Sequence, residues 1–241
     1  MKIIVSPAKT QQNEQVLNVP FTDLRFYKNS EALLLKIQSY SKDELATVMS
    51  IKGKLLEQTV ETFASYNQNE PTHGIRLYTG LVFKGLEPLE YTTEEQVYLR
   101  NHVRILSAFY GVVEPFDAVK PYRLDMKMKV LEEGLYKFWQ EPINQYFGDE
   151  EIINLASSEF SKLIKTPMTT VTFKEEKEAG IYKVVGTYAK QARGNMLLWM
   201  IRNNIQTIES IKGFDQYGYQ FNTELSTKNN LVFTRSQKFS L

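Results

Sequence analysis

Residues 2–10 read "KIIVSPAKT", in which three β-branched residues lead into a proline and a group of polar side chains. The apolar part predicts a short buried strand that ends at Pro7. In α/β sheets, ligands collect just beyond the carboxyl ends of strands, where Ser6, Lys9 and Thr10 would offer two hydroxyls and an ammonium. The run lacks the glycines of a P-loop, so on its own an ordinary turn at the end of the strand is favoured.

Other apolar runs predict further strands. Those at 103–113 and 151–157 are expected to be buried, the first as a strand or a short helix, and the run at 75–86 as an interrupted strand. Alternation is strictest in "YRLDMKMKV" at 122–130, with one apolar and one charged face, so this is the clearest predicted strand. A hairpin of 169–175 with 181–189 is expected around "EKEAG".

Helices are marked by capping residues and by apolar spacing. The tetrads "SKDE" at 41–44 and "TTEE" at 92–95 are capping boxes, the second opening a helix to about His102. Apolar residues three or four apart predict helices at 30–40, 135–147, 158–164 (capped by Ser158) and 184–205. Residues 11–29 have no clear period and are expected to form a long connection. The mixture predicts one α/β or α+β domain built on a mixed sheet.

Composition excludes several classes of protein. The chain has 241 residues and no cysteine, which rules out disulfides, thiolate metal sites and a cysteine nucleophile. No long apolar run or signal-peptide core is present, so we expect a cytoplasmic protein with no membrane contact. The net charge of +1 means that nucleic-acid binding would require an uneven distribution of charge. His73 and His102 lack a partner four residues away, and neither a metal site nor a cofactor is expected.

The helix expected at 184–205 places two cations where its later turns place Leu and Ile. At the helical period, Lys190 lies within about 20° of Leu197 and Ile201, and Arg193 lies one turn before Leu197. An unpaired cation on a buried stripe is costly, so this part of the helix is expected to face an anion, carboxylates or a wet cleft.

Two explanations of these cations remain open. In the functional one, they line a phosphate or carboxylate site, and Gly194 lets a ligand or another backbone come close. In the structural one, their side chains extend to solvent at the end of the helix or pair with Asp125 or Glu159.

A second basic group consists of Arg104, Lys120 and Arg123, close in sequence to Tyr110 and Tyr122. Cations interleaved with aromatic rings suit phosphates and stacked bases. The alternative is the solvated face of a strand, which we favour for the two lysines that follow.

A third candidate is the helical hairpin "VMSIKGKLL" at 48–56. Its tight turn would present backbone N–H groups to a DNA phosphate, with Lys52 and Lys54 adding charge around Gly53. Most short helical hairpins only pack, and this one lacks the paired glycines usual in a helix–hairpin–helix motif.

Seven segments, in order, resemble the bacterial YaaA family, also known as DUF328 or UPF0246. They are "IIVSPAKT", "YTGLVFKGL", "LRNHVRILSAFYGVVEPFDAVKPYRLDMKMKV", "LYKFWQEPI", "INLASSEFSKLI", "YAKQARGNMLLWMI" and "GFDQYGYQF" through "LVFTR". The resemblance spans nearly the whole chain and implies one family-specific α/β domain, residues 1–241, with a basic cleft and a helix–hairpin–helix element. The chain has "FYGVV" where "LYGVL" is common, a change in packing more than in chemistry.

The resemblance also implies a function. Family members are described as binding DNA and protecting it during peroxide stress, in part by limiting free iron. The basic residues carried over are Lys9, Arg104, Arg123, Lys190 and Arg193, with the hairpin lysines if "SIKGK" occupies the family's hairpin position.

The sequence therefore predicts a monomeric DNA-binding protein, weakly sequence-specific, with no assigned catalytic residue. The expected DNA- or anion-binding residues are Ser6, Lys9, Thr10, Lys52, Lys54, Arg104, Lys120, Tyr122, Arg123, Lys190 and Arg193. The alternative is an enzyme acting on a phosphorylated, nucleotide or carboxylate small molecule in the same cleft, because Lys9 or a tyrosine beside Asp125 would suit acid–base chemistry.

Overall fold

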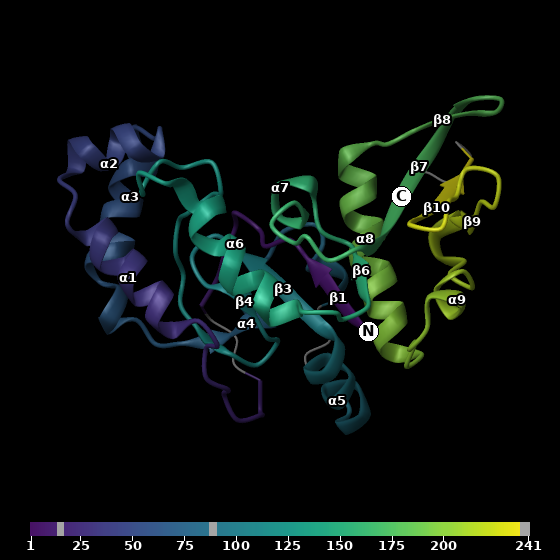
Figure 1. Ribbon diagram of the computed structural model, residues 1–241, viewed down its shortest axis with the longest axis horizontal. Coiled ribbons are helices and arrows are strands. Elements are labelled where there is room, and N and C mark those ends of the chain that lie inside the picture. The colour runs from purple at the N-terminus through teal and green to yellow at the C-terminus, as the bar shows by residue number, and fades with distance from the viewer. Residues whose placement is uncertain (14–16, 87–90, 237–241) are drawn as a thin grey trace.

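A computed structural model describes residues 1–13, 17–86 and 91–236 of the protein. Within these ranges, eight strands form one mixed sheet in the order β4-β3-β1-β6-β7-β10-β9, with β8 paired to β7 (Figure 1). The strands are β1 (Lys2–Val5), β3 (Val103–Ser107), β4 (Gly111–Val113), β6 (Ile152–Asn154), β7 (Met168–Glu178), β8 (Ile181–Lys183), β9 (Gln220–Phe221) and β10 (Asn230–Arg235). The neighbours among β3, β1, β6, β7 and β10 pair in parallel, whereas β4, β8 and β9 are antiparallel additions. A small second sheet joins β2 (Thr72–His73) to β5 (Ala118–Val119).

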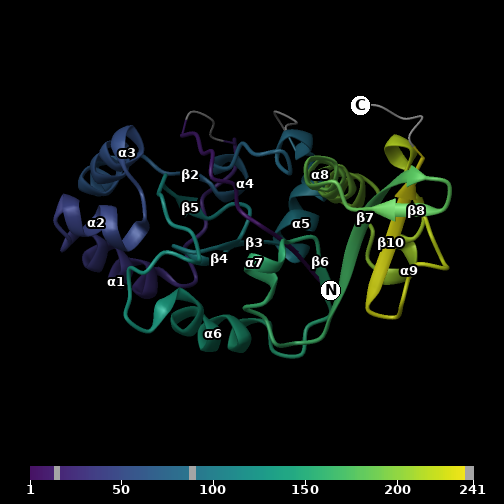
Figure 2. The same cartoon turned by 90° about the horizontal axis from the view of Figure 1, so that it is seen from above.

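Helices cover both faces of the sheet. They are α1 (Tyr27–Gln38), α2 (Lys42–Met49), α3 (Gly53–Ala64), α4 (Gly74–Leu77), α5 (Thr93–His102), α6 (Gly134–Phe147), α7 (Ser158–Ser161), α8 (Gly186–Arg202) and α9 (Ile208–Ile211), with short 3₁₀ helices η1 (Tyr66–Gln68), η2 (Lys84–Leu86) and η3 (Gln216–Gly218). Figure 2 shows α6 on one side of the sheet and α5 with α8 on the other, while α1–α3 gather at the end far from β10. None of the helices described is long and apolar enough to cross a membrane.

The predicted mixed α/β architecture is confirmed, and its local signals explain why. Both capping boxes form: Ser41 and Thr92 each accept from a backbone N–H three residues on, and the glutamate there caps back. The apolar runs at 103–113 and 151–157 lie in the core because parallel strands are buried on both faces. The first of them is a hairpin of β3 and β4.

The strand predicted at 122–130 is wrong, although its alternation of buried and exposed side chains is present. No strand of the described ranges pairs with it to form a ladder. Instead, the Lys129 N–H donates to the Val48 carbonyl at 2.7 Å, and the Tyr122 N–H donates to the Gln11 side chain at 2.8 Å. A half-buried extended segment produces the same period of two as a strand, so the pattern alone does not distinguish them.

The interrupted strand predicted at 75–86 is also wrong. The segment starts inside α4, makes a single bridge from Tyr78 to Gln11, and turns into η2. A Cβ on Gly80 would lie 2.6 Å from the Ala8 Cβ, so the segment packs tightly against the chain after β1. This close packing favours a compact loop over an extended strand.

Three boundaries also differ from the predictions. The residue capping α7 is Ser157, one position before the Ser158 that was expected. The hairpin partner of β7 is only three residues long, because the chain enters α8 at Gly186. Of the long connection predicted at 11–29, residues 14–16 lie outside the described ranges, and the helix begins earlier than expected, at Tyr27.

Candidate functional site

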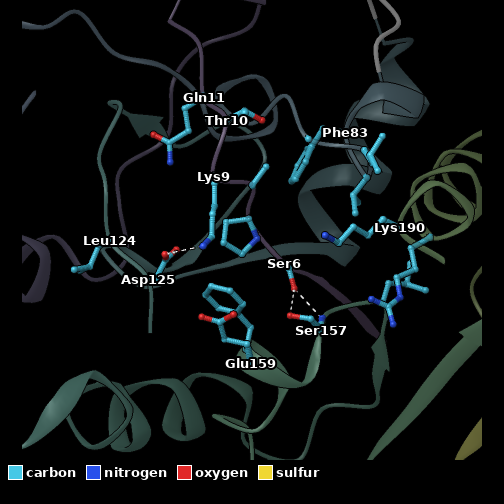
Figure 3. A pocket seen from close by; sticks show the side chains of 18 of the residues that line it. Ser6, Lys9, Thr10, Gln11, Phe83, Leu124, Asp125, Ser157, Glu159 and Lys190 are labelled. Carbon is cyan, nitrogen blue, oxygen red and sulfur yellow. Dashed lines mark hydrogen bonds and ion pairs between the residues drawn. The ribbon is translucent and has the colours of Figure 1, made fainter. Parts of the chain in front are cut away.

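A cavity of about 390 Å³ lies at the carboxyl ends of β1 and β6. From β1 the chain proceeds to β3 on one side, and β6 later pairs on the other side. The strand order therefore reverses at the gap between β1 and β6, which is where open α/β sheets bind ligands. Ser6 follows β1, Ser157 follows β6, and both line the cavity (Figure 3).

The two serines connect the strand ends. The Ser6 hydroxyl donates to the Ser157 hydroxyl at 3.1 Å and accepts from the Ser157 backbone N–H at 2.8 Å. The Ala156 N–H, just before, donates to the Asn154 side chain at 2.8 Å. These bonds hold two hydroxyl oxygens at fixed positions in the cavity wall. The hydroxyl hydrogens can still rotate toward a ligand.

A cluster of three charged side chains lines another part of the cavity. The Lys9 ammonium lies 3.0 Å from an Asp125 carboxylate oxygen, and an Arg123 Nη lies 3.6 Å from the same oxygen. Lys9 is 67% exposed, so its ion pair is well solvated and weak. One carboxylate therefore partly compensates two cations. Asp125 pairs with these two residues and not with Lys190 or Arg193, the alternative that the sequence left open.

The third wall comes from α8, which contributes Lys190 and Arg193. Neither forms an ion pair with any described carboxylate. The Arg193 Nε is buried without a hydrogen-bond partner, and burial lowers the pKa of this side chain. Arg193 is partly buried and Lys190 is exposed, so the stripe that buries Leu197 and Ile201 further along faces the cavity at these two positions and not the core. The core-facing residues there are Ala189 and Ala192, because the first turns of α8 border the cavity.

Gly194 allows the backbone of another segment to approach α8 closely, as its missing side chain suggests. A Cβ at this position would lie 2.0 Å from the Val82 carbonyl oxygen. The loop that carries Val82 and Phe83 is thus held against α8, and both residues line the cavity. The separation of these two walls is set by direct contact between backbones.

Tyr122 forms part of the floor. Its hydroxyl shares hydrogen bonds with the Ser107 hydroxyl at 2.8 Å and the Tyr78 hydroxyl at 3.1 Å. Burial raises the pKa of Tyr122 to about 12, so the phenol stays protonated near neutral pH. The hydrogen bonds among Ser107, Tyr78 and Tyr122 thus connect the end of β3 to the cavity wall.

Seven of the predicted residues come together here, and four lie elsewhere. The seven that line the cavity are Ser6, Lys9, Thr10, Tyr122, Arg123, Lys190 and Arg193. Arg104 is buried, 3.2 Å from the Glu114 carboxylate and bonded to the Tyr146 hydroxyl, which corrects its expected place in a ligand-facing group. Lys120 donates to the carbonyls of Tyr66 and Asn67, both at 3.2 Å, and lines a different hollow.

The remaining two, Lys52 and Lys54, are exposed at the start of α3. α2 and α3 are joined by a short turn at 50–52, in which Ser50 is left-handed with φ 53°. A shallow groove runs along α3 and shares Lys9 and Arg123 with the cavity.

No sequence pattern marked the apolar part of the cavity lining. Phe83 and Phe160 both contribute to the cavity wall and are otherwise buried. Buried aromatic residues are usual in any core, so their pattern does not mark a ligand site. Only their position beside the polar strand ends does so.

Comparisons with known proteins point to one family over nearly the whole chain. A family model described as peroxide stress protein YaaA matches residues 1–225. A UPF0246 protein of Fusobacterium nucleatum is 38% identical, covering 98% of this chain and 99% of the relative. A UPF0246 protein of Agathobacter rectalis is 39% identical over 98% and 99% of the two chains, and one of Francisella tularensis subsp. novicida is 36% identical over 98% and 100%. The chain therefore belongs to the YaaA family of peroxide stress proteins, also called UPF0246.

Proposed function

We propose that the protein acts in peroxide stress as a cytoplasmic, monomeric DNA-binding protein that contacts DNA through phosphates. The observation that carries the proposal is the pair Lys190 and Arg193, which border the cavity and form no ion pair with a carboxylate of the described residues. Phosphate oxygens are the natural partners for such cations, because charge-assisted hydrogen bonds to phosphate are stronger than bonds to neutral acceptors.

The groove along α3 supports a longer contact. It shares Lys9 and Arg123 with the cavity and follows α3, whose N-cap is Lys52 and whose first turn contains Lys54. A DNA backbone lying along it would reach both groups of cations. Phosphate contacts position DNA and carry no direct sequence information, so the binding is weakly specific and favours bent, gapped or branched DNA.

Any lowering of free iron is, in this proposal, an indirect effect. The described residues contain no cluster of three or more histidines and carboxylates that would hold a metal ion. Coating DNA would reduce damage without the protein itself storing iron.

The test is fluorescence anisotropy with duplex, gapped and four-way-junction DNA between about 50 and 200 mM salt. The wild type is compared with Lys190→Glu, with the double variant Lys52→Glu/Lys54→Glu, and with a matched control of two exposed lysines outside the cavity, Lys127→Glu/Lys129→Glu. We expect salt-sensitive binding that the first two variants weaken at least tenfold relative to the control. Equal loss in all three would indicate a nonspecific charge effect, and no binding at low salt would refute the proposal.

A further inference from the structure

The interior of the cavity has the size of a small-molecule site. Its volume of about 390 Å³ lies in the range of roughly 300–1,000 Å³ that ligand pockets occupy. A DNA duplex is too wide to enter such a space. Whatever reaches the Ser6 and Ser157 hydroxyls must therefore be a small molecule or a single extruded unit of a larger one.

Charge is unevenly distributed around this space. In Figure 3 the Ser6–Ser157 pair lies between Lys190 and the ion pair of Lys9 with Asp125. The positive charge on the Lys9 side is partly neutralised by Asp125. Glu159 also lines the cavity, but no described carboxylate, Glu159 included, forms an ion pair with Lys190 or Arg193. An anionic group is thus best accommodated on the α8 side of the two serines.

The hydroxyls beside these cations favour phosphate among anions. A phosphate monoester offers three acceptor oxygens and close to two negative charges at neutral pH. The Ser6 hydroxyl proton is donated to Ser157, so Ser157 supplies the free hydroxyl donor, and Lys190 and Arg193, which also line the cavity, supply charged donors.

The rest of the wall suits a flat, largely apolar body. Phe83 and Phe160 contribute aromatic rings, and Val82 and Leu155 contribute aliphatic surface. Because the loop at Val82 is held by backbone contact with Gly194, the width of the space is set before any ligand binds. Gln11 and Thr10 offer hydrogen bonds at the far end.

We propose that this cavity binds a nucleoside monophosphate unit, with its phosphate between the α8 cations and the serine pair. The unit is either a free nucleotide or one nucleotide exposed at a gap in a DNA strand, since the chemistry is the same. The proposal does not depend on duplex binding, because the cavity and its cations are sufficient for a free nucleotide.

The first experiment measures thermal stabilisation and calorimetric binding of the full chain with AMP, with adenosine and with inorganic phosphate. At about 100-fold excess over the dissociation constant, AMP is expected to raise Tm by about 5 °C or more. Adenosine, which lacks the phosphate, should give a much smaller shift. No shift with AMP, or equal shifts with AMP and adenosine, would overturn the proposal.

Variants then locate the site. Lys190→Ala changes an exposed residue, so folding should be preserved, and it should weaken AMP binding about tenfold while leaving adenosine unaffected. Ser157→Ala should weaken it less, and Lys127→Ala, an exposed lysine outside the cavity, should not change it. Equal affinity of Lys190→Ala and Lys127→Ala for AMP would place the nucleotide elsewhere and refute the assignment.

Competition separates the two sources of the nucleotide and the two proposals. If AMP displaces DNA with a one-nucleotide gap but not intact duplex, the cavity accepts a nucleotide of the strand. If AMP binds and no DNA does, the nucleotide site stands and the DNA-binding proposal fails. If DNA binds and AMP does not, the DNA-binding proposal stands and the nucleotide site is refuted.

Discussion

Two arginines, Arg193 on α8 and Arg235 on β10, show how differently the protein uses the same side chain. The Arg235 Nε donates to the Glu175 carboxylate at 2.6 Å, and its guanidinium lies over the Tyr188 and Tyr219 rings at 4.9 and 4.7 Å. The Tyr219 hydroxyl donates to the other Glu175 oxygen. One Nη of Arg235 still lacks a partner, but the charge itself is compensated. Arg193 has no such carboxylate.

The difference separates a charge that serves the fold from one available to a ligand. In parallel strands β7 and β10, Glu175 and Arg235 are register partners, so the sheet itself brings the pair together. Nothing in the sheet supplies a partner for Arg193, which faces a cavity instead. Functional sites commonly retain such costs because activity requires them.

The largest effect is expected when the compensated charge loses its partner. Glu175→Ala leaves the buried Arg235 guanidinium without a carboxylate and the Tyr219 hydroxyl without its acceptor. Breaking a buried pair in this way costs about 3–5 kcal/mol, which corresponds to a Tm lower by about 10 °C. Urea unfolding of the purified variant measures this loss of unfolding free energy.

Glu175→Gln is the matched control, since it keeps the shape and one acceptor and should cost less than the alanine variant. A loss below about 1 kcal/mol in Glu175→Ala would show that Arg235 is solvated, and the contrast with Arg193 would disappear.

A second test concerns a buried carboxyl without a close cation. Asp117 is 1% exposed and accepts from the Thr22 hydroxyl at 2.7 Å and the Glu114 N–H at 2.8 Å. Burial raises its pKa from 3.8 to about 7, so the folded protein binds a proton that the unfolded chain has released. Its contribution to stability therefore falls as pH rises from about 4 to 7, by about 2 kcal/mol between pH 5 and pH 7.

Urea titrations at several pH values of the wild type and Asp117→Asn check this. The variant cannot titrate, so its stability should change less over the same range. Parallel pH profiles would mean that the carboxyl is ionised in the folded state throughout.

Local signals in the sequence were sufficient for much of the fold. A capping box needs only a Ser or Thr and a Glu three residues on, so the starts of α2 and α5 were predictable from their own residues. The segment at 122–130 lacked such information, since whether an alternating run becomes a strand depends on a neighbour that pairs with it. Among the described residues, the backbone N–H groups of Tyr122 and Lys129 donate to a side chain and to a helix carbonyl instead.

The third test changes the contact that sets the cavity width. Gly194→Ala places a methyl group 2.0 Å from the Val82 carbonyl, so α8 or the loop must move. Overpacking of this kind costs about 1–3 kcal/mol. Gly186→Ala, in the first turn of the same helix, meets nothing within 4 Å and should be neutral or slightly stabilising.

Thermal unfolding of the two alanine variants side by side gives the answer. If Gly194→Ala is as stable as Gly186→Ala, the loop yields easily, and the cavity is not held open by backbone contact.

The candidate site was predictable as three separate basic segments but not as one place. Lys9 follows β1, Arg123 lies in the extended segment at 122–130 and Lys190 lies on α8, so only the tertiary packing of these three elements brings the cations to one cavity. Arg104 looked equally suitable, yet its side chain is bonded to Glu114 and Tyr146 in the interior. Whether a cation has a partner is a property of tertiary structure, so residue type alone overestimated the site.

The smallest expected effect is the most direct test of the contrast between the two arginines. Arg193→Met replaces a partly buried, unpaired guanidinium with an apolar chain of similar length, which should leave stability unchanged or raise it by about 0.5–1 kcal/mol. Arg235→Met should instead lose stability, because Glu175 would remain buried and uncompensated. Differential scanning with and without phosphate adds a second readout: the anion should stabilise the wild type more than Arg193→Met. A variant less stable than wild type and equally responsive to phosphate would mean that Arg193 supports the fold as Arg235 does, and that the anion meets other residues.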